Sequence, residues 1–258
     1  KKHGNGQPQL LLDLNRLESN IIAIRSRFLS HLKPRLVVKS LANLDLIKHV
    51  ATAFNTKAFM VFHLPHIARL FQTYPQANIL MGKPMPTQAF RYYLAKGAQG
   101  LSQIQWLIDS IPRLMQYLEL ARQCRCRILV NLEIDVGLHR GGFSDLNEFE
   151  QALRLIQNNA QYLQLSGLMG YDAHIAKLPK ALFTPVKTYQ ASQQRYQQFI
   201  RIIEQIYPDV DIAKLTFNGA GSGTLHHHLI QSVCNDVSFG SMLLKPSDFD
   251  LEGLIHLQ

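Results

Sequence analysis

The chain has 258 residues, of which 47% are apolar and 17% charged, a composition typical of a globular domain with a large core. The formal charge is +9, but lysine and arginine are scattered without a run or stripe, which argues against nucleic-acid binding. No apolar run reaches the ~20 residues of a membrane-spanning helix, and Cys124, Cys126 and Cys234 form no disulfide framework. We therefore expect a cytoplasmic protein that binds neither nucleic acid nor membrane.

Short apolar segments alternate with amphipathic helical patterns along the chain. A helical face precedes the first segment and is formed by Leu14, Leu17, Ile21, Ile24, Phe28 and Leu32. The expected strands are 35–39, 58–62, 79–82, 99–104, 127–135, 163–171, 214–218 and 236–240. The expected helices between them are 44–54, 65–73, 87–96, 105–122, 146–158, 187–206 and 224–232. Trp106 is assigned to the face of one of these helices, and 172–186 to a long loop, a candidate lid.

Strands that alternate with helices predict a parallel sheet, and this number of units in one domain predicts a (β/α)8 TIM-type barrel over 1–258. A doubly wound open sheet is the alternative. It is weakened because no GxGxxG follows the first strand.

The active site of such a barrel lies at the carboxyl ends of its strands. The expected strand ends carry the following groups: Lys39, His63, Lys83, Asp135, residues 137–142, Tyr171, Asp172, His174, residues 218–224 and residues 238–241. Among them "GAGSGT", 219–224, combines three glycines, whose backbone N–H groups can approach an anion closely, with two hydroxyl donors. It follows the seventh strand, where barrels commonly bind phosphate. It lacks the lysine of a nucleotide P-loop, which argues against ATP or GTP.

A phosphate site and a lysine at one barrel mouth suggest pyridoxal 5′-phosphate, because an amine can attach its aldehyde while the loop holds its phosphate. Chemistry alone leaves Lys39 and Lys83 open, and it leaves open that Lys39 is a solvated loop lysine.

Five ordered segments resemble the fold-type III pyridoxal-phosphate enzymes, the alanine-racemase-like barrels, and most of all the D-threonine aldolase and D-serine dehydratase group. They are "QPQLLLDLNRLESNI", "RLVVKS", "EIDVGLHRGGF", "GLMGYDAH", and "GAGSGT" with "SFGS". The resemblance implies that Lys39 is the Schiff-base lysine, that Arg140 meets the cofactor's ring oxygen and that Tyr171 packs near the ring. It assigns the phosphate to Gly221, Ser222, Gly223 and Thr224, with Gly240 and Ser241 after the eighth strand. Ser238 takes the position that faces the pyridine nitrogen, where the group usually has arginine or glutamine.

The resemblance implies a lyase that cleaves or dehydrates a D-3-hydroxy amino acid. An amino-acid racemase and a non-catalytic protein that carries pyridoxal phosphate are the alternatives. Family enzymes continue into a C-terminal β-domain, which in the aldolase group binds a divalent metal such as zinc or manganese, and they form homodimers. We expect that domain in the full-length protein, and we expect the barrel alone to bind cofactor but to turn over substrate slowly.

The sequence indicates less specific roles for the other polar residues. Within 1–258 we predict no metal site: His226, His227 and His228 are consecutive on a helix, cannot converge on one ion, and are taken as structural. His63 and His174 are candidates to polarise a substrate group, and Asp135 either caps a turn or orients Arg140.

Overall fold

The computed structural model describes residues 6–7, 10–97, 100–176, 184–247 and 256–258. Residues 8–9 of the opening segment, Gln99 of the predicted fourth strand and 177–183 of the predicted long loop lie outside this part.

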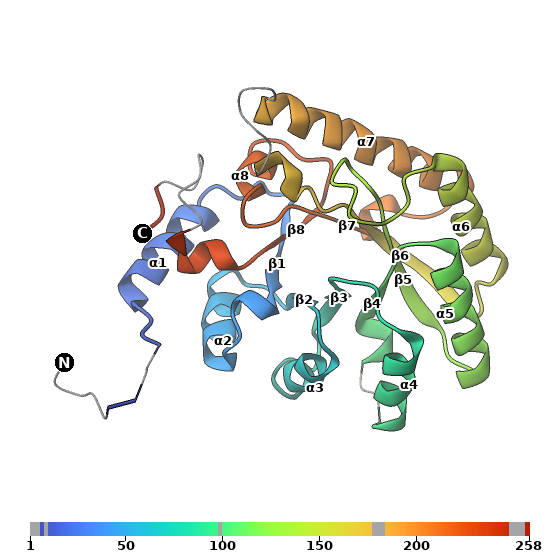
Figure 1. The fold of residues 1–258 in the computed structure, drawn as a ribbon, viewed down its shortest axis with the longest axis horizontal. Helices are drawn as coiled ribbons and strands as arrows, with labels where there is room; N and C mark the ends of the chain where they lie inside the picture. Colours follow the sequence, from blue (N-terminus) through green and yellow to red (C-terminus); the bar gives the residue numbers. More distant parts are fainter. Residues whose placement is uncertain (1–5, 8–9, 98–99, 177–183, 248–255) are drawn as a thin grey trace.

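In the described part of the chain, eight parallel strands close into a barrel in sequence order, which confirms the predicted (β/α)8 fold (Figure 1). The strands are β1 (Lys33–Val37), β2 (Ala58–Val61), β3 (Asn78–Met81), β4 (Ile104–Ile108), β5 (Ile128–Glu133), β6 (Leu163–Met169), β7 (Thr216–Gly219) and β8 (Asp236–Phe239). The first strand pairs with the last, with Arg35 opposite Ser238. A closed sheet leaves no edge strand, so every crossover must carry its helix on the outside.

Helices surround the barrel in the order of the strands (Figure 1). They are α1 (Leu14–Arg25), α2 (Leu44–Ala53), α3 (Leu64–Thr73), α4 (Thr87–Ala95), α5 (Ile111–Cys124), α6 (Leu146–Asn158), α7 (Pro185–Ile206) and the short α8 (Leu225–His228). Short 3-10 turns are η1 (Val38–Ser40), η2 (Leu101–Gln103), η3 (Ala173–Ala176), η4 (Ile212–Lys214) and η5 (Ser241–Leu244). None of the helices in the described part of the chain is both long and apolar enough to cross a membrane.

Helix α1 precedes the barrel and packs beside η5 (Figure 1). Asp13 caps its start by accepting hydrogen bonds from two backbone N–H groups of the first turn. The helix ends at Arg25, so Phe28 and Leu32 of the predicted helical face lie beyond it. Phe28 still reaches the core, where its ring lies 5.8 Å from that of Phe239.

The fourth strand was predicted wrongly, because it covers Ile104–Ile108 and not 99–104. Trp106 therefore lies in β4, not on a helix, and is 1% exposed between the rings of Phe90 and Tyr117. Helix α5 starts only after Ser110, whose hydroxyl accepts from a backbone N–H of the first turn, and Pro112 lies in that turn. This helix-start signal is present in the sequence and marks the correct boundary.

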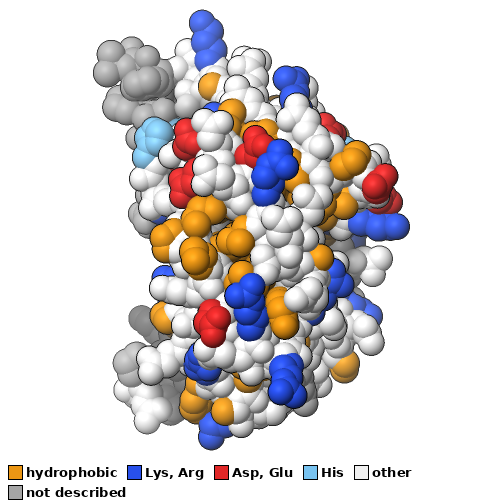
Figure 2. Space-filling model, turned by 90° about the vertical axis from the view of Figure 1, so that its right-hand side faces the viewer, with side chains coloured by type: hydrophobic (Ala, Val, Ile, Leu, Met, Phe, Trp, Pro, Cys, Tyr) orange, Lys and Arg blue, Asp and Glu red, His pale blue; other side chains and the backbone are white. Residues whose placement is uncertain are grey.

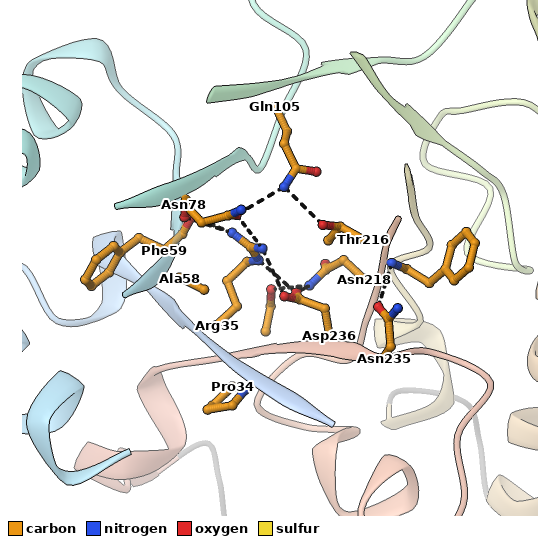
Figure 3. Close-up of polar contacts among 12 residues, drawn as sticks. Pro34, Arg35, Ala58, Phe59, Asn78, Gln105, Thr216, Asn218, Asn235 and Asp236 are labelled. Carbon is orange, nitrogen blue, oxygen red and sulfur yellow. Dashed lines mark hydrogen bonds and ion pairs between the residues drawn. The ribbon is translucent and has the colours of Figure 1, made fainter. Parts of the chain in front are cut away.

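A buried polar network fills the amino-terminal end of the barrel (Figure 3). Arg35 binds both carboxylate oxygens of Asp236, at 2.8 and 2.9 Å, and donates to Asn78 and to the Phe59 carbonyl. Its remaining N–H donates to the Asn78 carbonyl, so every donor of the guanidinium has a partner. The network thus fills the interior of the barrel at the amino-terminal ends of the strands.

The positive charge is dispersed on the face drawn in Figure 2, where Lys and Arg side chains are interspersed with Asp and Glu. The net charge of +9 is therefore not gathered into a single stripe on that face.

Candidate active site

A cavity of about 230 Å³ opens at the carboxyl ends of the strands. Its lining residues come from seven of the strands and the turns that follow them: Val37, Lys39, Ser40, Met60, Phe62, Gly82, Arg140, Met169, Tyr171, Asn218, Ala220, Gly221, Ser222, Ser238 and Ser241. The cavity thus gathers seven of the ten predicted site residues: Lys39, Arg140, Tyr171, Gly221, Ser222, Ser238 and Ser241.

Lys39 lies in the 3-10 turn η1, because β1 ends at Val37 and not at Lys39 as predicted. Its Nζ is 4.0 Å from the centre of the Phe62 ring. Gly82 leaves room for that ring, since a Cβ there would lie 2.3 Å from Phe62 Cζ. Burial, together with the charges of Arg140 and Lys83, lowers the pKa of Lys39, so the neutral and nucleophilic amine forms more readily than in a free lysine.

Arg140 is held by Glu133, a residue that the sequence analysis did not single out. Arg140 Nη2 lies 2.5 Å from Glu133 Oε1, and the guanidinium carbon lies 4.9 Å from the centre of the Tyr171 ring. Burial raises the pKa of Glu133, and the hydrogen bond and charge of Arg140 oppose that rise. Asn131 and Glu133 are buried polar residues at alternate positions of β5, and this pattern was the available signal for inward-facing polar groups.

Asp135 caps the turn after β5. One of its oxygens accepts from the backbone N–H groups of Gly137 and His139, and the other pairs with the His139 ring at 2.6 Å. The first of the two predicted roles for Asp135, capping a turn, is therefore the one that the structure shows. Gly142 in the same turn has a φ of 89°, and a Cβ there would lie 2.7 Å from the Glu133 carbonyl oxygen.

Hydrogen-bond donors converge on Ser222 Oγ at the side of the cavity formed by the ends of β7 and β8. The backbone N–H groups of Gly240 and Met242 lie 3.2 Å from this oxygen, and the Ser241 hydroxyl lies 3.1 Å from it. A hydroxyl oxygen has two lone pairs, so these donors exceed what it can accept. The turn after β8 therefore retains hydrogen-bond donors that can bind an anion.

Close packing accounts for two of the glycines at this side of the cavity. A Cβ on Gly221 would lie 2.7 Å from the Tyr171 ring, and one on Gly240 would lie 2.9 Å from Ser40 Cβ. Burial raises the pKa of Tyr171, which keeps its hydroxyl protonated.

Three predicted phosphate residues do not line the cavity: Gly223, Thr224 and Gly240. Gly240 contributes its backbone N–H to the Ser222 cluster, as described above. Thr224 is 1% exposed, and its hydroxyl donates to Asp172 Oδ1 at 2.6 Å. Asp172 Oδ2 lies 2.8 Å from His228 Nε2, so one of the three consecutive histidines joins this buried cluster.

Ser238 lies on β8 at the cavity floor, and its hydroxyl accepts from Asn218 Nδ2 at 2.8 Å. The same amide donates to Asp236, which links the cavity floor to the polar network below it. Among the described residues that line the cavity there is no Asp or Glu. The lining thus offers no carboxylate to a pyridine nitrogen, and the group at the Ser238 position is a neutral hydroxyl.

The two histidine candidates do not line this cavity. His174 Nε2 lies 3.3 Å from Ser192 Oγ, and its ring faces a separate hollow with Asp135, Lys187 and Arg195. His63 precedes α3, with its ring 5.8 Å from that of His66. Within the described ranges, no group of three or more His, Cys, Asp or Glu could hold a metal ion.

The sequence matches the model of the family "Alanine racemase, N-terminal domain" over residues 12–248. The chain belongs to this family. Its barrel is that of the fold-type III pyridoxal-phosphate enzymes, as the resemblance implied.

Solved structures show the same fold at low sequence identity. Alanine racemase from E. faecalis superposes with a TM-score of 0.72 at 17% identity, over 96% of this chain and 62% of that one. D-threonine aldolase from Filomicrobium marinum gives 0.73 at 19%, over 95% and 66%. A variant of D-threo-3-hydroxyaspartate dehydratase gives 0.70 at 17%, over 89% and 57%. The chain thus spans less than two thirds of the alanine racemase, and no curated protein matches it by sequence.

Proposed function

We propose that the protein binds pyridoxal 5′-phosphate in the barrel cavity, attaches it through Lys39 and acts on an amino acid. The observation that carries this proposal is the presence, in one cavity, of an amine with a lowered pKa and of a surplus of donors around Ser222. An aldehyde and a phosphate are the two groups of the cofactor that these features fit.

The remaining residues of the cavity fit the ring of the cofactor. Arg140 would hold the ring oxygen, with its guanidinium kept in place by Glu133, and Tyr171 would pack against the ring. Ser238 would meet the pyridine nitrogen with a neutral hydroxyl, which cannot keep that nitrogen protonated as a carboxylate would. Bound pyridoxal phosphate supplies a ring that accepts electron density from the α-carbon of the amino acid.

Lys39 would act twice in such a reaction. Its amine first attaches the cofactor, and once the amino acid has replaced it the free Nζ can take or return a proton on its own face of the substrate. The lowered pKa favours the attachment of the cofactor and the removal of a proton, because both need the neutral amine. A proton that Lys39 has taken is then returned from its ammonium form.

The reaction that we favour is a lyase reaction on a D-3-hydroxy amino acid, either aldol cleavage or loss of water and ammonia. The support is the set of segments that resemble the D-threonine aldolase and D-serine dehydratase group, together with the likeness of the barrel to a D-threonine aldolase. Either reaction needs a group that polarises the substrate hydroxyl, and a divalent metal is suited to that task. By the resemblance, that metal would come from a C-terminal β-domain of the full-length protein, which would be a homodimer.

Racemisation of an amino acid is the second candidate. Several structural neighbours are alanine racemases, and a cavity lining without a carboxylate suits a reaction that needs only modest electron withdrawal. A pyridoxal-phosphate carrier without turnover is the third.

Incubation of the full-length protein with D-threonine, D-serine and D-alanine, with and without a metal chelator, separates these functions. The lyase predicts glycine and acetaldehyde from D-threonine, or pyruvate and ammonia from D-serine, with loss of activity in the chelator. Formation of L-alanine from D-alanine as the only reaction would replace the lyase with the racemase. Tight cofactor binding without any turnover would leave the carrier.

A further inference from the structure

The hydroxyl of Thr224 is fully engaged behind the glycine loop. It donates to Asp172 Oδ1 at 2.6 Å and accepts from the Gly221 N–H at 3.1 Å. A threonine hydroxyl carries a single hydrogen, so in this arrangement it has none left for a phosphate. Thr224 can therefore affect an anion in the cavity only by changing the position of the glycine loop, residues 219–224.

Asp172 and His228 form a buried hydrogen-bonded pair that fixes this hydroxyl. Both side chains are at most 2% exposed, and the second ring nitrogen of His228 lies 2.8 Å from Ser232 Oγ. Burial acts to raise the pKa of Asp172, but His228 and then the Thr224 hydroxyl lower it below its usual value. The acceptor for Thr224 is thus a carboxylate, and hydrogen bonds to charged groups are the stronger ones.

The loop is fixed to the end of β6 at two points. Asp172 binds Thr224, and the preceding residue, Tyr171, packs against Gly221. Ser222 lies between these two anchored positions, and its oxygen gathers the donors of the turn after β8.

We propose that Thr224, held by Asp172 and His228, is a positioning residue that fixes Ser222 against the turn after β8 and so sets the affinity for the phosphate of the cofactor. This inference rests on the proposed function, because it takes the phosphate of pyridoxal phosphate to be the anion. Thr224 touches neither the cofactor's aldehyde nor its ring, since it does not line the cavity.

The consequence is an effect on one end of the cofactor only. Pyridoxal carries the same aldehyde and ring as pyridoxal phosphate but lacks the phosphate. A change that loosens Ser222 weakens the binding of the phosphorylated compound and leaves the attachment of pyridoxal to Lys39 unchanged. A change that merely destabilises the barrel weakens both.

The test is a titration of the full-length protein with each compound, followed by the visible absorbance of the lysine-bound form. Thr224→Val removes the hydroxyl and keeps the shape of the side chain. We expect its affinity for pyridoxal phosphate to fall by about tenfold or more, as for the loss of a hydrogen bond to a charged group, with no change for pyridoxal. Thr224→Ser restores the hydroxyl and is expected to restore most of the affinity.

Thr216→Val is the matched control. The Thr216 hydroxyl accepts from Gln105 Nε2 in the polar network of Figure 3, at the other end of the same strand, β7. Its loss is expected to leave the affinity for both compounds as in the wild type. Thr224→Ala, which removes the hydroxyl by a different truncation, is expected to repeat the pattern of Thr224→Val and replaces it if that variant does not fold.

The positioning role would be overturned if a folded Thr224→Val or Thr224→Ala lost affinity equally for the two compounds. It would also be overturned if the affinity for pyridoxal phosphate were undiminished in such a variant. Circular dichroism and thermal unfolding establish that each variant is folded. Failure of the wild type to attach either compound is a different result, because it would overturn the proposed function itself.

Discussion

The amine of Lys39 lies among other cationic groups at the mouth of the barrel. Burial contributes most to its lowered pKa, and the charges of Arg140 and Lys83 add to the effect. Since a lowered pKa leaves more neutral amine at a given pH, these charges move the reaction of Lys39 with an aldehyde toward neutral pH.

Removal of one of these charges tests the arrangement. In Lys83→Met the pKa of Lys39 is expected to rise, so the pH at which pyridoxal attaches at half its maximal rate should move upward. Pyridoxal is the better probe, because it has no phosphate that Lys83 could attract. Lys57→Met, at the opposite end of the barrel, is the control and should leave the profile in place. An identical profile for all three proteins would mean that Lys83 does not act on Lys39.

Glu133 provides a second test at the scale of one residue. Its pKa is raised by burial, so the folded state holds its proton more strongly than the unfolded chain does. This contribution to stability is present below the unfolded pKa of about 4.3 and is lost as the pH rises through the folded pKa.

Glu133→Gln removes this titration and keeps an oxygen that can accept from Arg140. Relative to that of the wild type, the variant's free energy of unfolding should therefore increase as the pH rises from about 4 to 7, because only the wild type loses the contribution of Glu133. Denaturant unfolding at several pH values measures the difference. If the difference in the free energy of unfolding between variant and wild type is constant across that range, Glu133 has an ordinary pKa. The kinetics of cofactor attachment serve as a separate check that Arg140 remains in place.

Among the elements, β1, β3, β4, β7 and β8 contribute side chains to the polar network at the amino-terminal end of the barrel. The Arg35–Asp236 pair is almost fully buried, with side chains 2% and 4% exposed. The removal of one partner from a buried pair leaves an uncompensated charge and commonly costs about 3–5 kcal/mol.

We therefore expect Asp236→Asn to lower the free energy of unfolding by about 3 kcal/mol, measured by denaturant titration without cofactor. Glu150→Gln is the control, because it breaks the exposed Glu150–Arg154 pair on α6 and should cost ~1 kcal/mol or less. Losses of equal size would show that burial of the Arg35–Asp236 pair does not govern its contribution.

The elements also show what a single sequence can predict. Strands with apolar runs between clear helix patterns were placed within a few residues, as β2, β3 and β8 show. Strand β4 was missed because its apolar residues also fit a helical pattern, whereas Ser110 and Pro112 mark the true start of the helix. The predicted helix 224–232 shrinks to the single turn α8, whose His228 is occupied with Asp172.

At the scale of the whole molecule, the closed barrel brings together residues from Lys39 to Ser241 in one cavity. Their strand-end positions could be predicted, because the carboxyl ends of parallel strands meet at one face of the barrel. The partners that fix them could not: Glu133 with Arg140, and Asp172 with Thr224 and His228, depend on which side chains meet across neighbouring strands and turns. The sequence thus indicates the chemistry of the site, while the structure supplies the contacts that orient it.

Covalent attachment of the cofactor to Lys39 is the central prediction for this protein. After incubation of the full-length protein with pyridoxal phosphate, borohydride reduction followed by peptide mass mapping locates the attachment site. We predict one pyridoxyl group per chain, on Lys39, and none in a Lys39→Ala variant that remains folded. A label on Lys83, or a wild-type protein that acquires no label, would contradict the assignment of the site.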